Sequence, residues 1–201
     1  MLTLLGISIP ELTRKEVMVR IEKAKTPFFI LTLNPEILLH AWKDKNYRKI
    51  INRAGLKIVD GIGLVIMAKL LYGITLKRFP GADLAEELLK FGAKQKKKIF
   101  LLGGSEEANR RATLRIKKNE LRITGLGGDF SFTDAIKKIV KFKSDIVLVA
   151  LGAPKQEILI HQLLQATHLR QGFGGQASYK LQAISSLKPT NIANNFCIIS
   201  Q

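Results

Sequence analysis

Asp60 is the carboxylate whose surroundings best suit chemistry. It ends the apolar run Leu56–Val59 and is followed by Gly61 and Gly63. Glycine lets the backbone turn sharply and approach a ligand, and a carboxylate at a strand end can act as a general base or bind a ribose. Asp60 can equally be only the N-cap of the helix that follows. The G-x-G pattern lacks the third glycine of a dinucleotide fingerprint, so it points only weakly to nicotinamide cofactors.

Polar residues also end the apolar run Phe28–Leu33. Thr32 lies within its last two residues, and Asn34 and Pro35 follow it directly. Asn34 suits the N-cap and Pro35 the first position of a helix, which explains both without a ligand. Side chains at this strand end could otherwise face a bound substrate.

A basic loop, Lys77–Asp83, precedes another expected helix. The guanidinium of Arg78, together with a helix N-terminus, could hold a diphosphate. Surface arginines are common, so Arg78 has an ordinary interpretation as well.

Glycine turns follow two more strand-like runs. Gly103 and Gly104 precede a helix whose first turn carries Glu106 and Glu107, and these acids would repel a phosphate. That turn therefore favours contact with a ribose or base, or simple helix capping.

The run Val147–Leu151 ends at Gly152, and a helix opens soon after with Lys155 and Gln156 at its mouth. These two side chains are placed for a ligand, although Gln156 and the adjacent Glu157 are also ordinary residues for a first helical turn.

Strand-like and helical patterns alternate through most of the chain. Short apolar runs at 2–9, 28–33, 56–59, 98–102, 121–125 and 145–151 predict strands, and helical periodicity predicts helices at 13–25, 35–50, 64–71, 82–94, 106–118, 134–143 and 154–164. This alternation predicts a Rossmann-like α/β fold, with a mostly parallel sheet and helices on both faces. Ligands of such folds bind beyond the carboxyl ends of the strands, where the candidate residues lie.

Composition and charge narrow the class of protein. The 201 residues are 46% hydrophobic and 24% charged, which is typical of a globular protein, and the single Cys197 excludes an internal disulfide. A net charge of +17 favours polyanions such as nucleic acid, anionic lipid and diphosphates. The apolar stretch 62–76 is too short and too interrupted to span a bilayer, and the N-terminus does not read as a signal peptide, so a cytoplasmic location is expected.

The composition changes near residue 170. Within 171–201 only Lys180 and Lys188 are charged, and Gln, Asn, Ser and Gly are frequent. We therefore expect an α/β domain at 1–170 and a poorly ordered, atypical tail at 171–201.

The order of the motifs TLNPE, VDGIG, RFPGAD, IFLLGGS and VALGAPKQE, after the opening LLGISI, resembles the bacterial WecB/TagA/CpsF family of glycosyltransferases from about Leu2 to Leu164. The resemblance implies a Rossmann-like enzyme at the inner face of the cell membrane. Such enzymes move N-acetylmannosamine, with inversion and without a metal, from a UDP-sugar to a polyprenyl-diphosphate-linked N-acetylglucosamine in teichoic acid or surface polysaccharide synthesis.

The resemblance also implies roles for single residues. Asp60 matches the proposed base, Thr32 and Asn34 line the same pocket, Arg78 lies near the diphosphate, and Gln156 contacts substrate. The expected substrate-binding set is completed by glycines and one lysine of the same motifs: Gly61, Gly63, Gly103, Gly104, Gly152 and Lys155. The implied partners are the UDP-sugar, the lipid-linked acceptor and an anionic membrane surface, with no cofactor, metal or nucleic acid. Homo-oligomerisation stays open.

The chain departs from the family after the APKQE helix. Family members continue into a GVGG-type strand and a basic appendage with RAP and GLEW-like motifs, whereas here Gly172-Phe173-Gly174-Gly175 is only a faint echo. Two alternatives therefore stay open: a catalytically silent remnant that binds sugar nucleotides, and a basic nucleic-acid-binding protein. For a nucleic-acid-binding protein, the chain lacks a recognisable motif of aromatic residues that would stack on bases.

Overall fold

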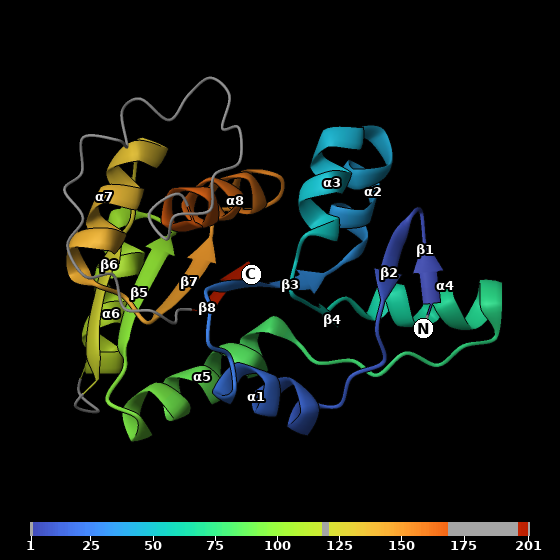
Figure 1. Ribbon diagram of the computed structural model, residues 1–201, viewed down its shortest axis with the longest axis horizontal. Helices are drawn as coiled ribbons and strands as arrows, with labels where there is room; N and C mark the ends of the chain where they lie inside the picture. The colour runs from blue at the N-terminus through green and yellow to red at the C-terminus, as the bar shows by residue number, and fades with distance from the viewer. Residues whose placement is uncertain (1, 118–120, 169–196, 201) are drawn as a thin grey trace.

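A six-stranded parallel sheet forms the centre of the computed structural model, which describes residues 2–117, 121–168 and 197–200 (Figure 1). Its strand order is β4-β3-β8-β7-β5-β6. The bounds are β3 Phe28–Leu33, β4 Leu56–Val59, β5 Lys98–Gly103, β6 Arg122–Leu126, β7 Ile146–Ala150 and β8 Cys197–Ser200. The predicted Rossmann-like α/β fold is confirmed.

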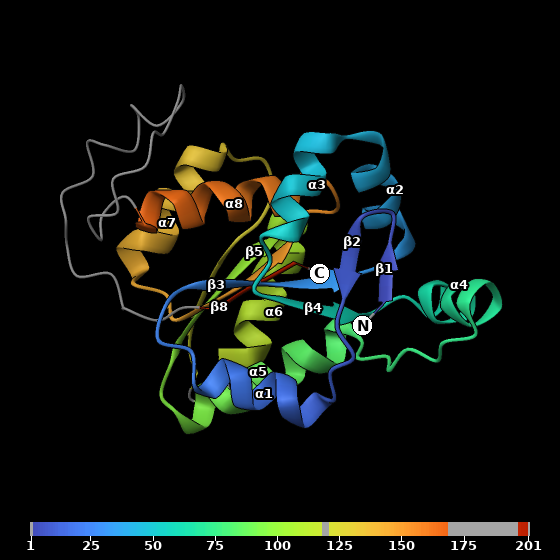
Figure 2. The same ribbon diagram turned by 45° about the vertical axis from the view of Figure 1, so that its right-hand side comes forward.

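Helices cover both faces of this sheet (Figure 2). One face carries α2 Pro35–Lys43, α3 Lys45–Asn52, α7 Phe132–Phe142 and α8 Lys155–His168. The other carries α1 Arg14–Glu22, α5 Gly81–Lys94 and α6 Glu106–Lys117. The connections that lead toward the β4 edge of the sheet, through α2, α3 and α7, cross the first face. The connections that lead toward the β6 edge, through α5 and α6, cross the second face. This is the arrangement that right-handed crossovers produce.

Successive side chains of a strand point to opposite faces of the sheet, so each strand contributes to a core on both faces. In β3, Phe29, Leu31 and Leu33 are buried in the core under α2, α3 and α8, whereas Ile30 is buried in the core under α1 and α5. Both sides of the strand are apolar because both sides are covered. The carboxyl end of β3 is therefore held firmly from two directions.

The predicted strand at 2–9 is a small hairpin outside the main sheet. β1 Leu2–Leu4 pairs antiparallel with β2 Ile7–Ile9. Leu5 and Gly6 between them have φ values of 50° and 77°, as a tight two-residue hairpin turn needs. The hairpin buries Leu4 and Ile7 in the same core as α2.

The helix predicted over 35–50 is two helices. Asp44 ends α2 with an extended backbone, and its carboxylate accepts hydrogen bonds from the N–H groups of Asn46 at 2.7 Å and Tyr47 at 3.2 Å. The residue is thus the N-cap of α3, a role that aspartate favours over a helix interior. Because the two helices are separate, α3 can pack against α8.

The tail predicted at 171–201 contains a strand. β8 pairs in parallel with β3 on one side and with β7 on the other, so it lies inside the sheet. Within the predicted tail, Cys197–Ser200 therefore form a short apolar strand that completes the backbone hydrogen bonds between β3 and β7. The rest of the predicted tail, apart from these four residues, lies outside the described residues.

Candidate active site

The loops after β3 and β4 form one cluster at the carboxyl end of the sheet. The carbonyl oxygen of Leu33 accepts hydrogen bonds from the N–H groups of Asp60, at 2.9 Å, and Gly61, at 3.3 Å. A Cβ atom on Gly61 would lie 2.9 Å from Cδ of Pro35, and one on Gly63 would lie 3.2 Å from its Cγ. The two glycines therefore let the two loops touch.

Asp60 joins this cluster to a third segment. Its Oδ1 accepts a hydrogen bond from the N–H of Gly81, the first residue of α5, at 3.1 Å. Its carbonyl oxygen accepts one from Nε of Arg78 at 2.6 Å. Asp60 is therefore not the N-cap of the helix that follows it: that helix, α4 Ile62–Tyr72, has Gly61 as its N-cap without a side-chain hydrogen bond. The carboxylate instead holds the N-terminus of α5.

The second carboxylate oxygen of Asp60, Oδ2, has no hydrogen-bond partner within the described residues. The side chain is half-buried, between a strand end and a helix N-terminus. One oxygen is thus fixed while the other is available for a proton, which is the arrangement that a general base needs.

The basic loop runs beside the end of β4. Phe79 donates its N–H to the carbonyl oxygen of Val59 at 2.8 Å, and Arg78 next to it is exposed. Gly81 packs over Thr32, whose Cγ2 would lie 3.2 Å from an added Cβ. The structure thereby brings Thr32, Asp60 and Arg78, predicted from three separate motifs, into one cluster.

Asn34 has the structural role that its position suggested. Its Oδ1 accepts a hydrogen bond from the N–H of Ile37 at 2.9 Å, so it is the N-cap of α2. The side chain is half-buried at the mouth of the cluster. Capping occupies the amide oxygen, so only the Nδ2 group would be free to donate to a ligand.

A second group of predicted residues lies at the ends of β5 and β7. Gly103 has a φ of 114°, and a Cβ there would lie 2.0 Å from the carbonyl oxygen of Ala150. Gly104 and Gly152 also have positive φ, at 72° and 74°. Lys155 is exposed at the start of α8. Strand β8 lies between β7 and β3, so the two groups share the carboxyl edge of the sheet with one strand between them.

Gly103→Ala tests how closely β5 and β7 approach each other there. We expect the substitution to lower the free energy of unfolding by at least about 2 kcal/mol, since it adds a backbone clash to a strained φ. Gly152→Ala is the matched control, because nothing lies within 4 Å of its added Cβ. It should cost only about 1–2 kcal/mol for the left-handed conformation. Equal losses in urea denaturation would contradict the close approach.

Asn109 supports this second group and was not among the predicted residues. Its Nδ2 donates to the carbonyl oxygens of Gly103 at 2.9 Å, Leu126 at 3.1 Å and Leu101 at 3.2 Å. The side chain thus ties α6 to the ends of β5 and β6. The sequence carries only a weak signal for it, a lone amide inside a charged helix.

A buried polar chain joins α3 to α8. Nε2 of Gln156 donates to Oε1 of Glu157 at 2.7 Å, and the hydroxyl of Tyr47 donates to Oε2 of the same carboxylate at 2.8 Å. Gln156 is 2% exposed, Tyr47 3% and Glu157 not at all. Oε1 of Gln156 is buried without a hydrogen-bond partner among the described residues. An unsatisfied buried acceptor is rare in folded proteins and calls for an explanation, which makes this oxygen a candidate for contact with a substrate.

Burial raises the pKa of Glu157 above its ordinary value of 4.5, against the opposing effect of the hydrogen bonds from Gln156 and Tyr47. The folded protein therefore keeps this proton to a higher pH than the unfolded chain does. The stability that Glu157 contributes is complete below pH 4.5 and is lost as the pH rises through its folded pKa.

Glu157→Gln should remove this pH dependence. As the pH rises from 4.5 toward neutrality, the free energy of unfolding of the variant should gain on that of the wild type, by at most about 1.4 kcal/mol per pH unit for one proton. Chemical denaturation of both proteins across that range measures the difference. A difference that is constant with pH would mean that Glu157 has the same pKa in the folded and unfolded states.

The described residues contain no candidate metal centre. Within 2–117, 121–168 and 197–200, no three His, Cys, Asp or Glu side chains gather to form a set of ligands. The positive charge available near Asp60 is that of Arg78, whose Nε is bound to the Asp60 carbonyl oxygen.

Residues 2–183 match the sequence profile of the glycosyl transferase WecG/TagA/CpsF family. The chain is similar to the N-acetylglucosaminyldiphosphoundecaprenol N-acetyl-beta-D-mannosaminyltransferase of Bacillus subtilis, with 35% identity over 66% of this chain and 53% of that protein. It is also similar to a protein of the same name from Staphylococcus aureus MRSA252, with 32% identity over 73% of this chain and 60% of that protein. The chain thus spans between half and two thirds of the length of these curated relatives.

Proposed function

Because the chain belongs to the WecG/TagA/CpsF family of glycosyl transferases, we propose that it transfers N-acetylmannosamine, or a related sugar, from a UDP-sugar to a polyprenyl-diphosphate-linked N-acetylglucosamine. The name of the two relatives describes such an acceptor and such a sugar. The observation that carries the proposal is Asp60, which has one carboxylate oxygen fixed by α5 and binds Arg78 through its main-chain carbonyl oxygen.

Asp60 acts as the general base of this transfer. Its Oδ2 takes the proton of the acceptor hydroxyl, whose oxygen attacks the anomeric carbon of the donor sugar. The bond from that carbon to the UDP oxygen breaks, and the electron pair leaves with UDP. A single displacement of this kind inverts the anomeric centre.

Arg78 stabilises the charge that develops on the departing diphosphate. Its Nε is held by the carbonyl oxygen of Asp60, so the other N–H groups of an exposed guanidinium are oriented beside the base. Donors that are fixed before the reaction stabilise a developing charge without reorganisation. The base and the diphosphate donor are thereby positioned by one hydrogen bond.

The remaining loops bind the donor. Thr32, Asn34, Gly61 and Gly63 shape the cluster around Asp60, and Gly103, Gly104, Gly152 and Lys155 line the ends of β5 and β7. The unpaired Oε1 of Gln156 accepts a hydrogen bond from the substrate. A UDP-sugar is extended enough to reach from one group to the other across the end of β8.

The acceptor places the reaction at a membrane. A polyprenyl diphosphate is anchored in lipid, and a chain with a net charge of +17 is attracted to an anionic leaflet. We therefore assign the protein to the cytoplasmic face of the cell membrane as a peripheral protein. Homo-oligomerisation is not required by this proposal.

A donor screen tests the proposed function. The protein is incubated with a lipid-diphosphate-linked N-acetylglucosamine and UDP-linked N-acetylmannosamine, N-acetylglucosamine or glucose, and the lipid product is resolved by mass. The proposal predicts an added N-acetylhexosamine with release of UDP. Release of UDP without a glycosylated lipid, or no product with any donor, would contradict it.

A further inference from the structure

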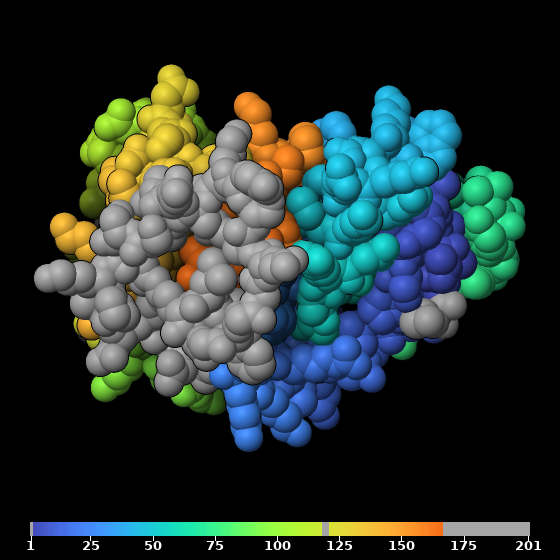
Figure 3. Space-filling model, turned by 45° about the horizontal axis from the view of Figure 1, so that its top comes forward, coloured from blue at the N-terminus to red at the C-terminus, as the bar shows by residue number. Residues whose placement is uncertain are grey.

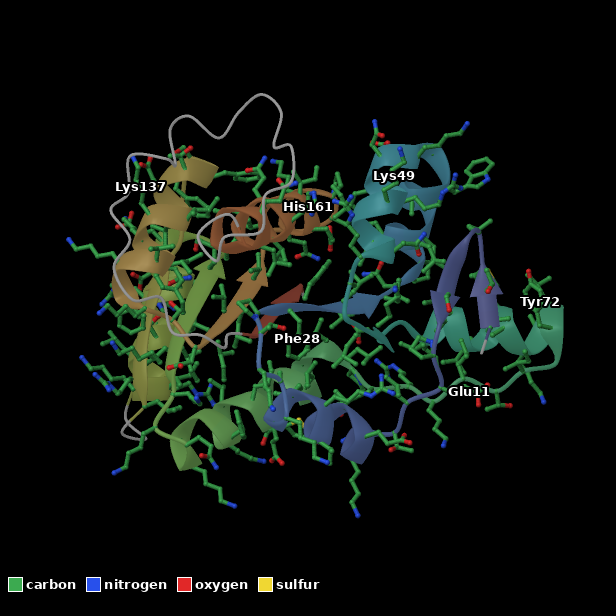
Figure 4. The ribbon with its side chains drawn as sticks, in the orientation of Figure 1. Glu11, Phe28, Lys49, Tyr72, Lys137 and His161 are labelled. Carbon is green, nitrogen blue, oxygen red and sulfur yellow. The ribbon has the colours of Figure 1, made fainter. Side chains whose placement is uncertain are left out.

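Helix α4 exposes an unusual amount of apolar surface. It contains five large apolar residues that are more than half exposed, which are Ile62 at 57%, Ile66 at 52%, Leu70 at 79%, Leu71 at 67% and Tyr72 at 52%. Scattered apolar side chains are normal on a protein surface, but a continuous apolar patch marks an interaction site. In Figure 3 this helix forms the outer edge of the molecule beside the hairpin, and in Figure 4 Tyr72 points away from the body.

The exposed residues follow the period of the helix. Ile62, Ile66 and Leu70 are four residues apart, so they lie along one side of α4. Leu64 and Ala68 are fully buried in the core. The helix is thus held on the protein by one side and presents the other to its surroundings.

The length of α4 and the charged residues near it indicate what its exposed side contacts. With 11 residues α4 is much shorter than the roughly 20 needed to cross a bilayer, and no helix in the described part of the chain is long and apolar enough to do so. Lys69 is the single charged residue of α4, and Lys77 and Arg78 follow in the next loop. An apolar helix with basic neighbours is typical of elements that lie in the interface of an anionic membrane.

We propose that α4 lies in the headgroup region of an anionic phospholipid bilayer, with the Ile62–Ile66–Leu70 side among the acyl chains and Lys69 at the phosphates. This inference rests on the proposed function for its meaning. Helix α4 starts directly after Asp60 and Gly61. Binding of α4 to the membrane therefore holds Asp60 and the loops around it at the bilayer surface. A lipid-anchored diphosphate would then meet the base without leaving the leaflet.

Vesicle sedimentation with matched variants tests this assignment. The protein is mixed with vesicles of phosphatidylcholine alone or with phosphatidylglycerol, and the bound fraction is measured for the wild type, Ile66→Asp/Leu70→Asp and Leu114→Asp. Leu114 on α6 is 50% exposed, close to the 52% of Ile66, so its variant is a control for a new surface carboxylate. Both substituted α4 residues are exposed, so folding should persist, and circular dichroism checks this.

We expect the wild type to prefer the anionic vesicles and the α4 variant to lose at least about tenfold in affinity, with Leu114→Asp within about twofold of the wild type. Unchanged binding by the α4 variant would overturn the assignment. It would also be overturned if the α4 substitutions turned a dimer into a monomer and left vesicle binding intact, because the face would then belong to a second copy.

Sugar transfer to a short water-soluble acceptor, measured in parallel, separates this inference from the proposed function. The α4 variant should keep wild-type transfer to the soluble acceptor and lose transfer to the lipid acceptor. Vesicle binding through α4 without any transfer would contradict the function and leave the membrane role standing. Transfer to both acceptors without vesicle binding through α4 would contradict the membrane role of α4 and support the proposed function.

Discussion

Asp60→Asn is expected to lower turnover by about 100-fold or more, the scale that is typical of removing a general base. Asparagine has the same shape, and its Oδ1 can still accept the hydrogen bond from the N–H of Gly81. The substitution thus removes the base and keeps the link to α5. Steady-state transfer with saturating UDP-sugar measures the loss, and UDP binding should be nearly unchanged.

Asp60→Ala separates the two roles of this residue. It removes the hydrogen bond to the N-terminus of α5 as well, so it should lower the free energy of unfolding by a further ~0.5–2 kcal/mol relative to Asp60→Asn. If Asp60→Asn turned over as fast as the wild type and only Asp60→Ala were impaired, the carboxylate would have a structural role alone.

Arg78→Gln should lower turnover by about 100- to 1,000-fold, since one preorganised donor to a developing charge is worth ~2.7–4 kcal/mol. The exposed guanidinium is joined to Asp60 through a main-chain carbonyl oxygen, so its loss should leave the fold intact. The fall should appear mainly in kcat. Thermal unfolding of the variant should remain close to that of the wild type.

Lys77→Gln is the matched control for Arg78→Gln. The two residues are adjacent and exposed, and both substitutions remove one positive charge. If the positive field alone stabilised the leaving group, the two variants would lose similar activity. We expect Lys77→Gln to stay within about threefold of the wild type, because a general surface charge is screened by salt.

The sequence predicted the strands and loops well where local pattern decides them. The run Phe28–Leu33 is apolar on both faces, and the structure buries it on both faces as β3. Asn34 before Pro35 predicted the start of α2, and the cap is present. These features depend on residues within one turn or one strand, which a single sequence displays.

Contacts between distant residues were harder to predict. Asp60 was considered as the cap of its own helix, but its partner is Gly81, across an intervening helix and loop. The place of Cys197–Ser200 between β3 and β7 depends on an open position in the sheet that its own four residues do not reveal. In both cases the deciding partner is remote in the chain.

The sequence did contain a signal for the buried pair Gln156 and Glu157. Glu157 was interpreted as an ordinary residue of a first helical turn, yet the structure buries it against Tyr47. Gln156 lies seven residues before the buried Leu163, which places it on the same side of α8. A polar residue on the apolar side of a helix is a reason to look for a buried partner.

The most direct test of the central claim is the binding of UDP to this chain. The claim is that the loops after β3, β4, β5 and β7 form one site for a UDP-sugar. UDP and a single-stranded DNA oligonucleotide are titrated separately by calorimetry at two salt concentrations, into the wild type and Arg78→Gln. We predict saturable UDP binding to one site, weakened in Arg78→Gln and only modestly sensitive to salt. No UDP binding, with DNA binding that falls steeply with salt, would contradict the claim and assign the positive charge to nucleic acid.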